Sequence, residues 1–276
     1  MRTRTAVAAA VAAAVLVPTA AASADDRRGG AERGRDLRAV GLVDGTQLVT
    51  FSVDRPGDVR RSAPLTGLQE DTELVGIDAR VQDGQVYGVG DRGGVYVLDA
   101  RRGTAQLALR LSVPLEGTAF GVDFNPAANA LRVVSDTGQN LRQPFATPGA
   151  ATVADTPLSS PPAAGTTTGV VGAAYTNNDL DAATATTLFV LNAATDQVAV
   201  QAPANAGTLS ATGALGVDVT GDAGFDIAGT TGYAVVPGTG GAAGRSTVHR
   251  VDVLTGKATA TGRVGAPVTD LALQLR

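Results

Sequence analysis

Aspartates at regular distances along the chain are the residues best suited to do chemistry. Three of them end the short segments Gly76-Ile77-Asp78, Gly121-Val122-Asp123 and Gly224-Phe225-Asp226, and weaker copies of the pattern end at Ala174 and Asp270. The steps between successive copies are 45, 51, 52 and 44 residues. Four carboxylates that converge on one place repel one another and attract a cation, and Ca²⁺ prefers such oxygen ligands. The alternative is a structural role, in which each aspartate caps a turn or accepts backbone N–H bonds.

A second group of polar residues is concentrated near the middle of the chain. Asn125-Pro126 and Asp136-Thr137-Gly138 are typical of tight turns, which is the structural interpretation. The functional interpretation is a polar pocket at one face of the fold, in which Arg132 or Arg142 holds an anionic or sugar ligand. The candidate ligand-binding residues are Asp123, Asn125, Arg132, Asp136, Asn140, Arg142, Tyr175 and Asn177.

Several kinds of chemistry are excluded by composition. The sequence has no cysteine, so it offers no thiol nucleophile, and its one histidine, His249, cannot build a histidine zinc site. A Ser-His-Asp triad lacks its G-x-S-x-G nucleophile elbow. The net charge is −4, and the folded part has no basic block, which argues against nucleic acid as a partner. Chemistry by paired carboxylates remains open.

The spacing of the aspartate segments also indicates the elements that carry them. Recurrence every 40–50 residues or so is typical of the blades of a β-propeller. Short strand candidates sort into groups of four, most clearly at 74–80, 85–89, 94–99 and 104–111. A strand at 268–274 joins three strands at the start, which predicts a first blade closed by both termini. We therefore predict an all-β protein, a five-bladed propeller, whose innermost strands bring Asp78, Asp123, Asp226 and Asp270 to the central channel as the candidate metal ligands.

The amino-terminal residues differ in character from the rest of the chain. Arg2 and Arg4, an apolar stretch at 6–17 and the small residues Ala22-Ser23-Ala24 predict a signal peptide at 1–24, cleaved after Ala24. Residues 25–36 are charged and predict a disordered leader, and 37–276 form the single propeller domain. We expect a secreted or extracytoplasmic monomer with no membrane span in the mature chain, because an apolar stretch of about 12 residues is too short to cross a bilayer.

Five segments resemble one protein family. They read GVDFNP at 121–126, LRVVSDTGQNLR at 131–142, AAYTNN at 173–178, QAPANAGTLSATGALGVD at 201–218 and GFDI at 224–227. In this order they are similar to the DUF4394 family, and the resemblance covers about residues 37–276. It implies a bacterial, mostly exported protein with a propeller-like fold, and it provides no catalytic residues.

Taken together, the residues favour an exported binding or interaction module for an unknown extracellular ligand or protein, with Ca²⁺ near the central channel. One alternative is a carboxylate- or cation-dependent hydrolase that acts at the channel mouth. Another is a structural or adhesive protein of the cell envelope. Propellers host unrelated functions, so the fold does not choose among these.

Overall fold

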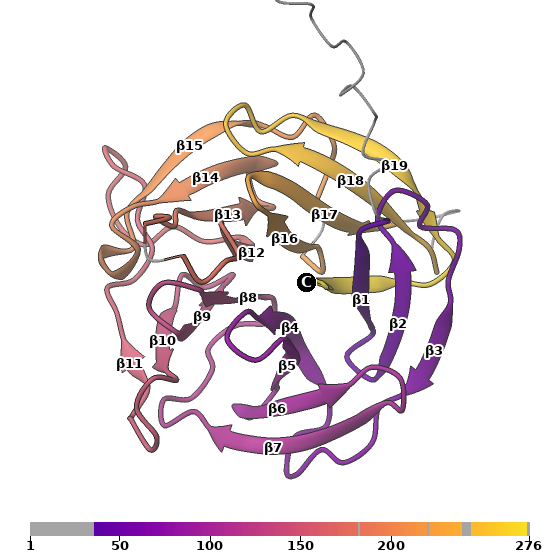
Figure 1. The fold of residues 1–276 in the computed structure, drawn as a ribbon. Coiled ribbons are helices and arrows are strands. Elements are labelled where there is room, and N and C mark those ends of the chain that lie inside the picture. Colours follow the sequence, from indigo (N-terminus) through magenta and orange to yellow (C-terminus); the bar gives the residue numbers. More distant parts are fainter. Residues whose placement is uncertain (1–35, 182, 220, 239–243, 275–276) are drawn as a thin grey trace, which may run out of the picture. The chain divides into compact units, whose positions relative to one another are not determined.

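A computed structural model describes residues 36–181, 183–219, 221–238 and 244–274. In this part of the chain, twenty strands form five four-stranded antiparallel sheets around a central channel, which is a five-bladed β-propeller (Figure 1). The expected signal peptide and the leader up to residue 35 lie outside the described residues. The last leader residue, Asp36, accepts hydrogen bonds from the Ser52 hydroxyl and the Arg55 guanidinium. Among the described residues, no helix has the length and apolarity needed to span a membrane.

Each sheet runs outward from the channel in chain order, apart from blade 1, whose innermost strand is the last in the sequence. Blade 1 contains β20 (Val268–Leu273), β1 (Arg38–Val43), β2 (Gln47–Ser52) and β3 (Arg61–Pro64). Blade 2 contains β4 (Leu74–Arg80), β5 (Gln85–Gly90), β6 (Gly94–Asp99) and β7 (Thr104–Arg110). Blade 3 contains β8 (Phe120–Asn125), β9 (Ala130–Ser135), β10 (Asn140–Pro144) and β11 (Val153–Ala154). Blade 4 contains β12 (Val170–Tyr175), β13 (Leu188–Asn192), β14 (Gln197–Gln201) and β15 (Leu209–Ala214), and blade 5 contains β16 (Gly224–Ala228), β17 (Thr231–Pro237), β18 (Ser246–Asp252) and β19 (Ala258–Val264).

The hairpin turns inside the blades follow from the residues with left-handed backbone. Gly103 and Gly256 have φ values of 71° and 76° in the turns before β7 and β19. The turn between β13 and β14, the second and third strands of blade 4, has Asp196 with φ 51°, as expected from a residue type that tolerates this conformation.

The core consists of five apolar layers, one between each pair of neighbouring blades. Between blades 1 and 2, for example, Val40 and Leu42 pack with Leu74 and Ile77. The layer between blades 3 and 4 has the fewest apolar members, and the polar side chains of Arg132, Asn140 and Gln201 are buried beside it. Buried polar groups need hydrogen-bond partners, so their concentration at this interface makes it a candidate binding site.

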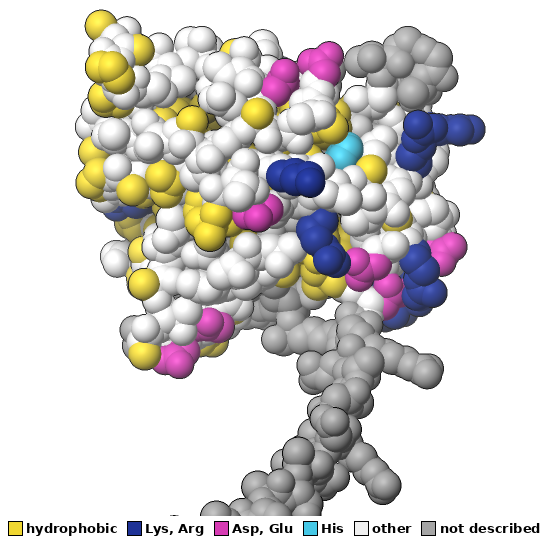
Figure 2. All heavy atoms as spheres, turned by 90° about the horizontal axis from the view of Figure 1, so that it is seen from above, with side chains coloured by type: hydrophobic (Ala, Val, Ile, Leu, Met, Phe, Trp, Pro, Cys, Tyr) yellow, Lys and Arg dark blue, Asp and Glu magenta, His cyan; other side chains and the backbone are white. Residues whose placement is uncertain are grey.

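Charged side chains are scattered over the side of the ring drawn in Figure 2. Lys and Arg stand apart from one another there, and they alternate with acidic, apolar and uncharged side chains. Such a mixture is ordinary for a water-exposed protein surface.

Candidate functional site

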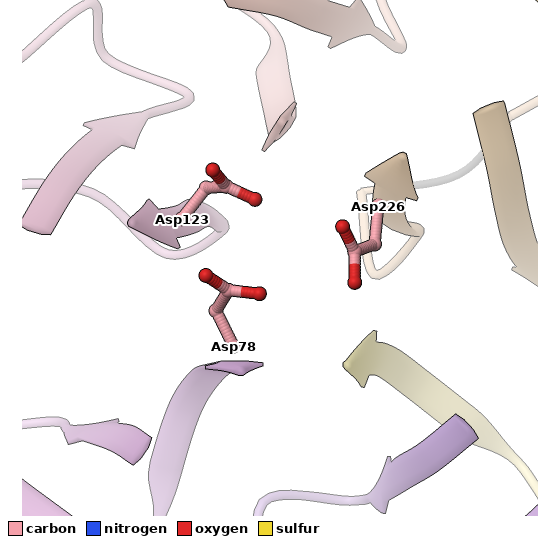
Figure 3. A group of neighbouring side chains, drawn as sticks. All are labelled: Asp78, Asp123 and Asp226. Atoms are coloured by element: carbon pink, nitrogen blue, oxygen red, sulfur yellow. The ribbon is translucent and has the colours of Figure 1, made fainter. Parts of the chain in front are cut away.

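Four of the regularly spaced aspartates surround the central channel. Asp78 lies in β4, Asp123 in β8, Asp226 in β16 and Asp270 in β20, and these are the innermost strands of their blades. Their exposed fractions are 4 %, 1 %, 2 % and 7 %, respectively. In Figure 3 the side chains of Asp78, Asp123 and Asp226 point toward one another from three different blades. The sequence-based alignment of these residues thus corresponds to one place in the fold.

Each of these carboxylates accepts a backbone N–H from the innermost strand of the next blade. The pairs are Phe124 N to Asp78 Oδ2 (2.7 Å), Tyr175 N to Asp123 Oδ1 (3.0 Å), Leu273 N to Asp226 Oδ2 (2.6 Å) and Ile77 N to Asp270 Oδ2 (2.8 Å). An innermost strand is a sheet edge, so its outward N–H groups have no neighbouring strand to pair with. The aspartates therefore have the structural role that the sequence offered as one alternative, and they join four of the five pairs of adjacent blades.

The glycine two residues before three of these aspartates allows the innermost strands to come close. A Cβ on Gly121 would lie 2.5 Å from the backbone nitrogen of Ala173 in the next blade. A Cβ on Gly224 would lie 2.4 Å from the Cα of Asp270. Real side chains do not approach backbone atoms so closely, so glycine and aspartate work as a pair: the first brings the strands together and the second bonds them.

The fifth position of the pattern is occupied by Ala174, which packs with Phe225 in the apolar layer between blades 4 and 5. One channel oxygen is also left without a partner. Asp123 Oδ1 accepts the bond from Tyr175, whereas no described residue hydrogen-bonds to the buried Oδ2 of the same carboxylate. An ionised oxygen without a partner is costly in a dry interior.

Burial and mutual repulsion raise the pKa values of the channel carboxyls. Burial raises the pKa of Asp226 to about 7, against hydrogen bonds from Leu273 and Ile227 that act to lower it. For Asp78 and Asp123 the pKa is raised first by burial and further by the charge of Asp226. The pKa of Asp270 is likewise raised, mainly by burial. The channel therefore favours any partner, whether a proton or a cation, that neutralises its negative charge.

The geometry of three of these groups suits a metal ion. One carboxylate oxygen each from Asp78, Asp123 and Asp226 lie within 4.8 Å of one another. Ca²⁺ binds oxygen at about 2.3–2.6 Å, so ligands on opposite sides of one ion are about 5 Å apart. The three oxygens can therefore belong to a single coordination shell.

A cavity of about 260 Å³ lies at the end of the ring where the innermost strands begin. Leu74, Phe120 and Thr269 line it, and so do three exposed acidic residues, Asp44, Glu73 and Asp222. Acidic side chains around an opening raise the local concentration of cations.

The candidate ligand-binding residues are only partly brought together. Asn125, Arg132, Arg142 and Tyr175 line a second cavity, of about 190 Å³, between blades 3 and 4. Asn140 belongs to the same cluster, because its Oδ1 accepts a hydrogen bond from Arg132 Nη1 at 2.7 Å. Asp123 lies directly opposite Arg132 in the neighbouring strand, but its carboxylate points to the channel.

The two remaining candidates lie elsewhere. Asp136 accepts hydrogen bonds from the N–H and hydroxyl of Thr118, at 2.9 and 2.8 Å, as expected of the turn role. Asn177 has a left-handed backbone with φ 59°, and its side-chain amide donates to the Ala185 carbonyl. Neither residue lines the cavity between blades 3 and 4.

Sequence reasoning missed two members of this cluster. Asp155 accepts from Arg132 Nη1 at 2.8 Å and from Arg142 Nε at 3.1 Å, and Asn205 Oδ1 accepts from Arg132 Nη2 at 2.7 Å. Asn205 lies in the short 3-10 helix η1 (Ala204–Ala206), and the sequence contains no local signal for its role. The only available signal for Asp155 was the need of two neighbouring arginines for an anionic partner.

A five-bladed propeller with buried carboxylates around its channel is the class of protein that the fold and the site define. The model of the DUF4394 family, a domain of unknown function, matches residues 47–272, so the chain belongs to this family. The family resemblance seen in the sequence is thereby confirmed. The comparison with curated proteins gave no match.

Proposed function

We propose that this protein is a binding module whose propeller holds one Ca²⁺ ion in its channel, on Asp78, Asp123 and Asp226. The observation that carries the proposal is the buried Oδ2 of Asp123, which has no hydrogen-bond partner among the described residues and lies beside two other carboxylates. A cation supplies the missing partner and neutralises the mutual repulsion of the three groups.

The burial of the carboxylates favours an ion-holding role over the hydrolase alternative. A catalytic carboxylate has to touch its substrate, and none of the four channel aspartates is more than 7 % exposed. A bound ion would instead add a contact among blades 2, 3 and 5, which contribute its ligands. The ion would thus rigidify the ring that presents a binding surface to an extracellular ligand or protein.

Export by the expected signal peptide at 1–24 is part of this proposal. Ca²⁺ modules outside the cell work with dissociation constants of roughly 10⁻⁴–10⁻³ M, because the ion is abundant there. The acidic side chains of Asp44, Glu73 and Asp222 at the channel mouth support entry of a cation from that side.

Isothermal titration calorimetry of the chelator-treated protein with CaCl₂ tests the metal site. We expect one ion per chain and a melting temperature that rises with Ca²⁺ and falls again with chelator. Asp123→Asn should abolish the binding heat, whereas the control Asp136→Asn should retain it, because Asp136 bonds to Thr118 outside the channel. No binding heat together with an unchanged melting temperature would overturn the proposal, as would an unchanged affinity in Asp123→Asn.

A further inference from the structure

The cavity of about 190 Å³ between blades 3 and 4 is built from both of its walls by polar groups. From blade 3 come Asn125 in β8, Arg132 in β9 and Arg142 in β10. From blade 4 come Tyr175 in β12 and Asn205 in η1. The cavity lies at the interface with the smallest apolar layer of the propeller, so polar groups replace hydrophobic packing there.

Strand register explains why the two arginines share this cavity. Arg132 in β9 is the direct partner of Arg142 in β10 and of Asp123 in β8. Residues directly opposite each other in neighbouring strands project from the same face of a sheet. This face of blade 3 meets blade 4, since Asp123 accepts the N–H of Tyr175 and Arg132 donates to Asn205.

The charges at the cavity do not balance. Arg132 and Arg142 both pair with a single carboxylate, that of Asp155, at 2.8 and 3.1 Å. Two guanidinium groups therefore share one negative charge, and the cluster has an excess of one positive charge. Arg132 is only 2 % exposed, so water screens this charge poorly.

Arg132 also has an unused donor. Its Nη1 donates to Asn140 and Asp155 and its Nη2 to Asn205, but no described residue accepts a hydrogen bond from the buried Nε. The Nε and Nη2 groups form the edge of a guanidinium that pairs with a carboxylate through two parallel bonds. Arg142 uses this same edge on Asp155, with bonds of 3.1 Å from Nε and from Nη2.

From this arrangement we infer that the cavity between blades 3 and 4 binds the carboxylate group of a small acid, with Arg132 and Arg142 as its anchors. The single excess charge matches a monoanion, and the unused donor matches a carboxylate oxygen. The volume corresponds to about six water molecules, enough for a small acid or the acidic end of a longer chain. The inference names the ligand class of the binding module proposed above, and it does not require the channel ion.

Calorimetric titration of the full chain with glucuronate tests the inference, with neutral glucose as the control ligand. Glucuronate should bind and glucose should not. Arg142→Gln should weaken glucuronate binding about tenfold or more, because a charged donor is lost while the strand remains. Arg110→Gln is the matched control: Arg110 is 30 % exposed beside the buried Asp71, as Arg142 is 29 % exposed beside Asp155, but it lies outside the cavity.

Two further arms identify the source of the carboxylate and guard against misfolding. A short peptide with a free carboxyl terminus is compared with its amide, which shows whether the acid belongs to a peptide chain. Asn205→Ala provides a second variant that keeps both arginines and should also weaken binding. Titrations are run with Ca²⁺ and with chelator, so that loss of the channel ion is read separately. If neither glucuronate nor the free-carboxyl peptide binds, or if Arg142→Gln and Asn205→Ala bind like the wild type, the inference is wrong and the cavity holds only water.

Discussion

In calcium-free buffer, raising the pH from about 4 to about 7 should lower the free energy of unfolding of this propeller. The pKa of Asp226 is raised by burial from 3.8 to about 7. Between those values the folded chain binds more protons at this site than the unfolded chain, so stability falls as the pH rises. At 1.36 kcal/mol per pKa unit, the difference amounts to roughly 4 kcal/mol, fully present below pH 4 and lost above pH 7. Asp78, Asp123 and Asp270 have raised pKa values too and add to the same trend.

Urea unfolding followed by circular dichroism at a series of pH values measures this dependence. Asp226→Asn has no proton to lose at this position, so its curve should be flatter than that of the wild type. Burial lowers the pKa of His249, which gives a contribution of opposite sign in the same window, and His249→Asn removes it as a control. The lowered pKa values of Asp91 and Asp136 act only below about pH 4, outside the window.

A wild-type stability that stays constant or increases from pH 4 to pH 7 would refute this reasoning, as would a slope in Asp226→Asn that is as steep as that of the wild type. Repeating the series with Ca²⁺ separates this prediction from the metal site. If the ion binds, it should restore stability at pH 7, whereas the calcium-free slope depends only on the buried carboxyls.

Two further substitutions test the interfaces between blades. Gly121→Ala should lower the free energy of unfolding by about 1–3 kcal/mol, because the new Cβ meets the backbone of Ala173 at 2.5 Å. Urea unfolding measures this loss against the control Gly265→Ala, where a Cβ meets no atom within 4 Å. Equal losses in the two variants would contradict the prediction. Arg132→Met should cost about 3 kcal/mol, because the buried Asn140 loses a charged donor and the exposed Asn205 loses the same partner. Scanning calorimetry measures this loss, and a loss no larger than that of Arg110→Met would count against the network.

The architecture was predictable because each blade repeats the same local pattern of short apolar strands and turn residues. Where a predicted strand is shortened, a side chain accepts a backbone N–H that would otherwise pair with a neighbouring strand. The grouping of strands in fours predicts a last strand of blade 3 at 150–155. This strand is reduced to Val153–Ala154, since the N–H of Thr152 bonds to the Ser112 hydroxyl rather than to a neighbouring strand. The 3-10 turn at Ala204–Ala206 was not expected either.

The candidate site was predictable only where its residues belong to the pattern. The alignment of Asp78, Asp123 and Asp226 anticipated their convergence, because equivalent positions in a propeller face the same channel. The arginine cluster was predicted without its partners. Asp155 lies 23 residues after Arg132, and Asn205 lies 73 residues after Arg132. Only the packing of blade 3 on blade 4 therefore brings the three residues together.

The innermost strand of blade 1 has a consequence for the order of events during synthesis. β20 is synthesised after the other nineteen described strands, and it contributes both the Asp270 carboxylate and the Leu273 N–H, which form two of the four aspartate bonds between blades. Until then, β1 has a free edge and the ring has neither of these bonds. A nascent chain that stops before β20 therefore has only three strands in blade 1, and the synthesis of β20 completes this sheet.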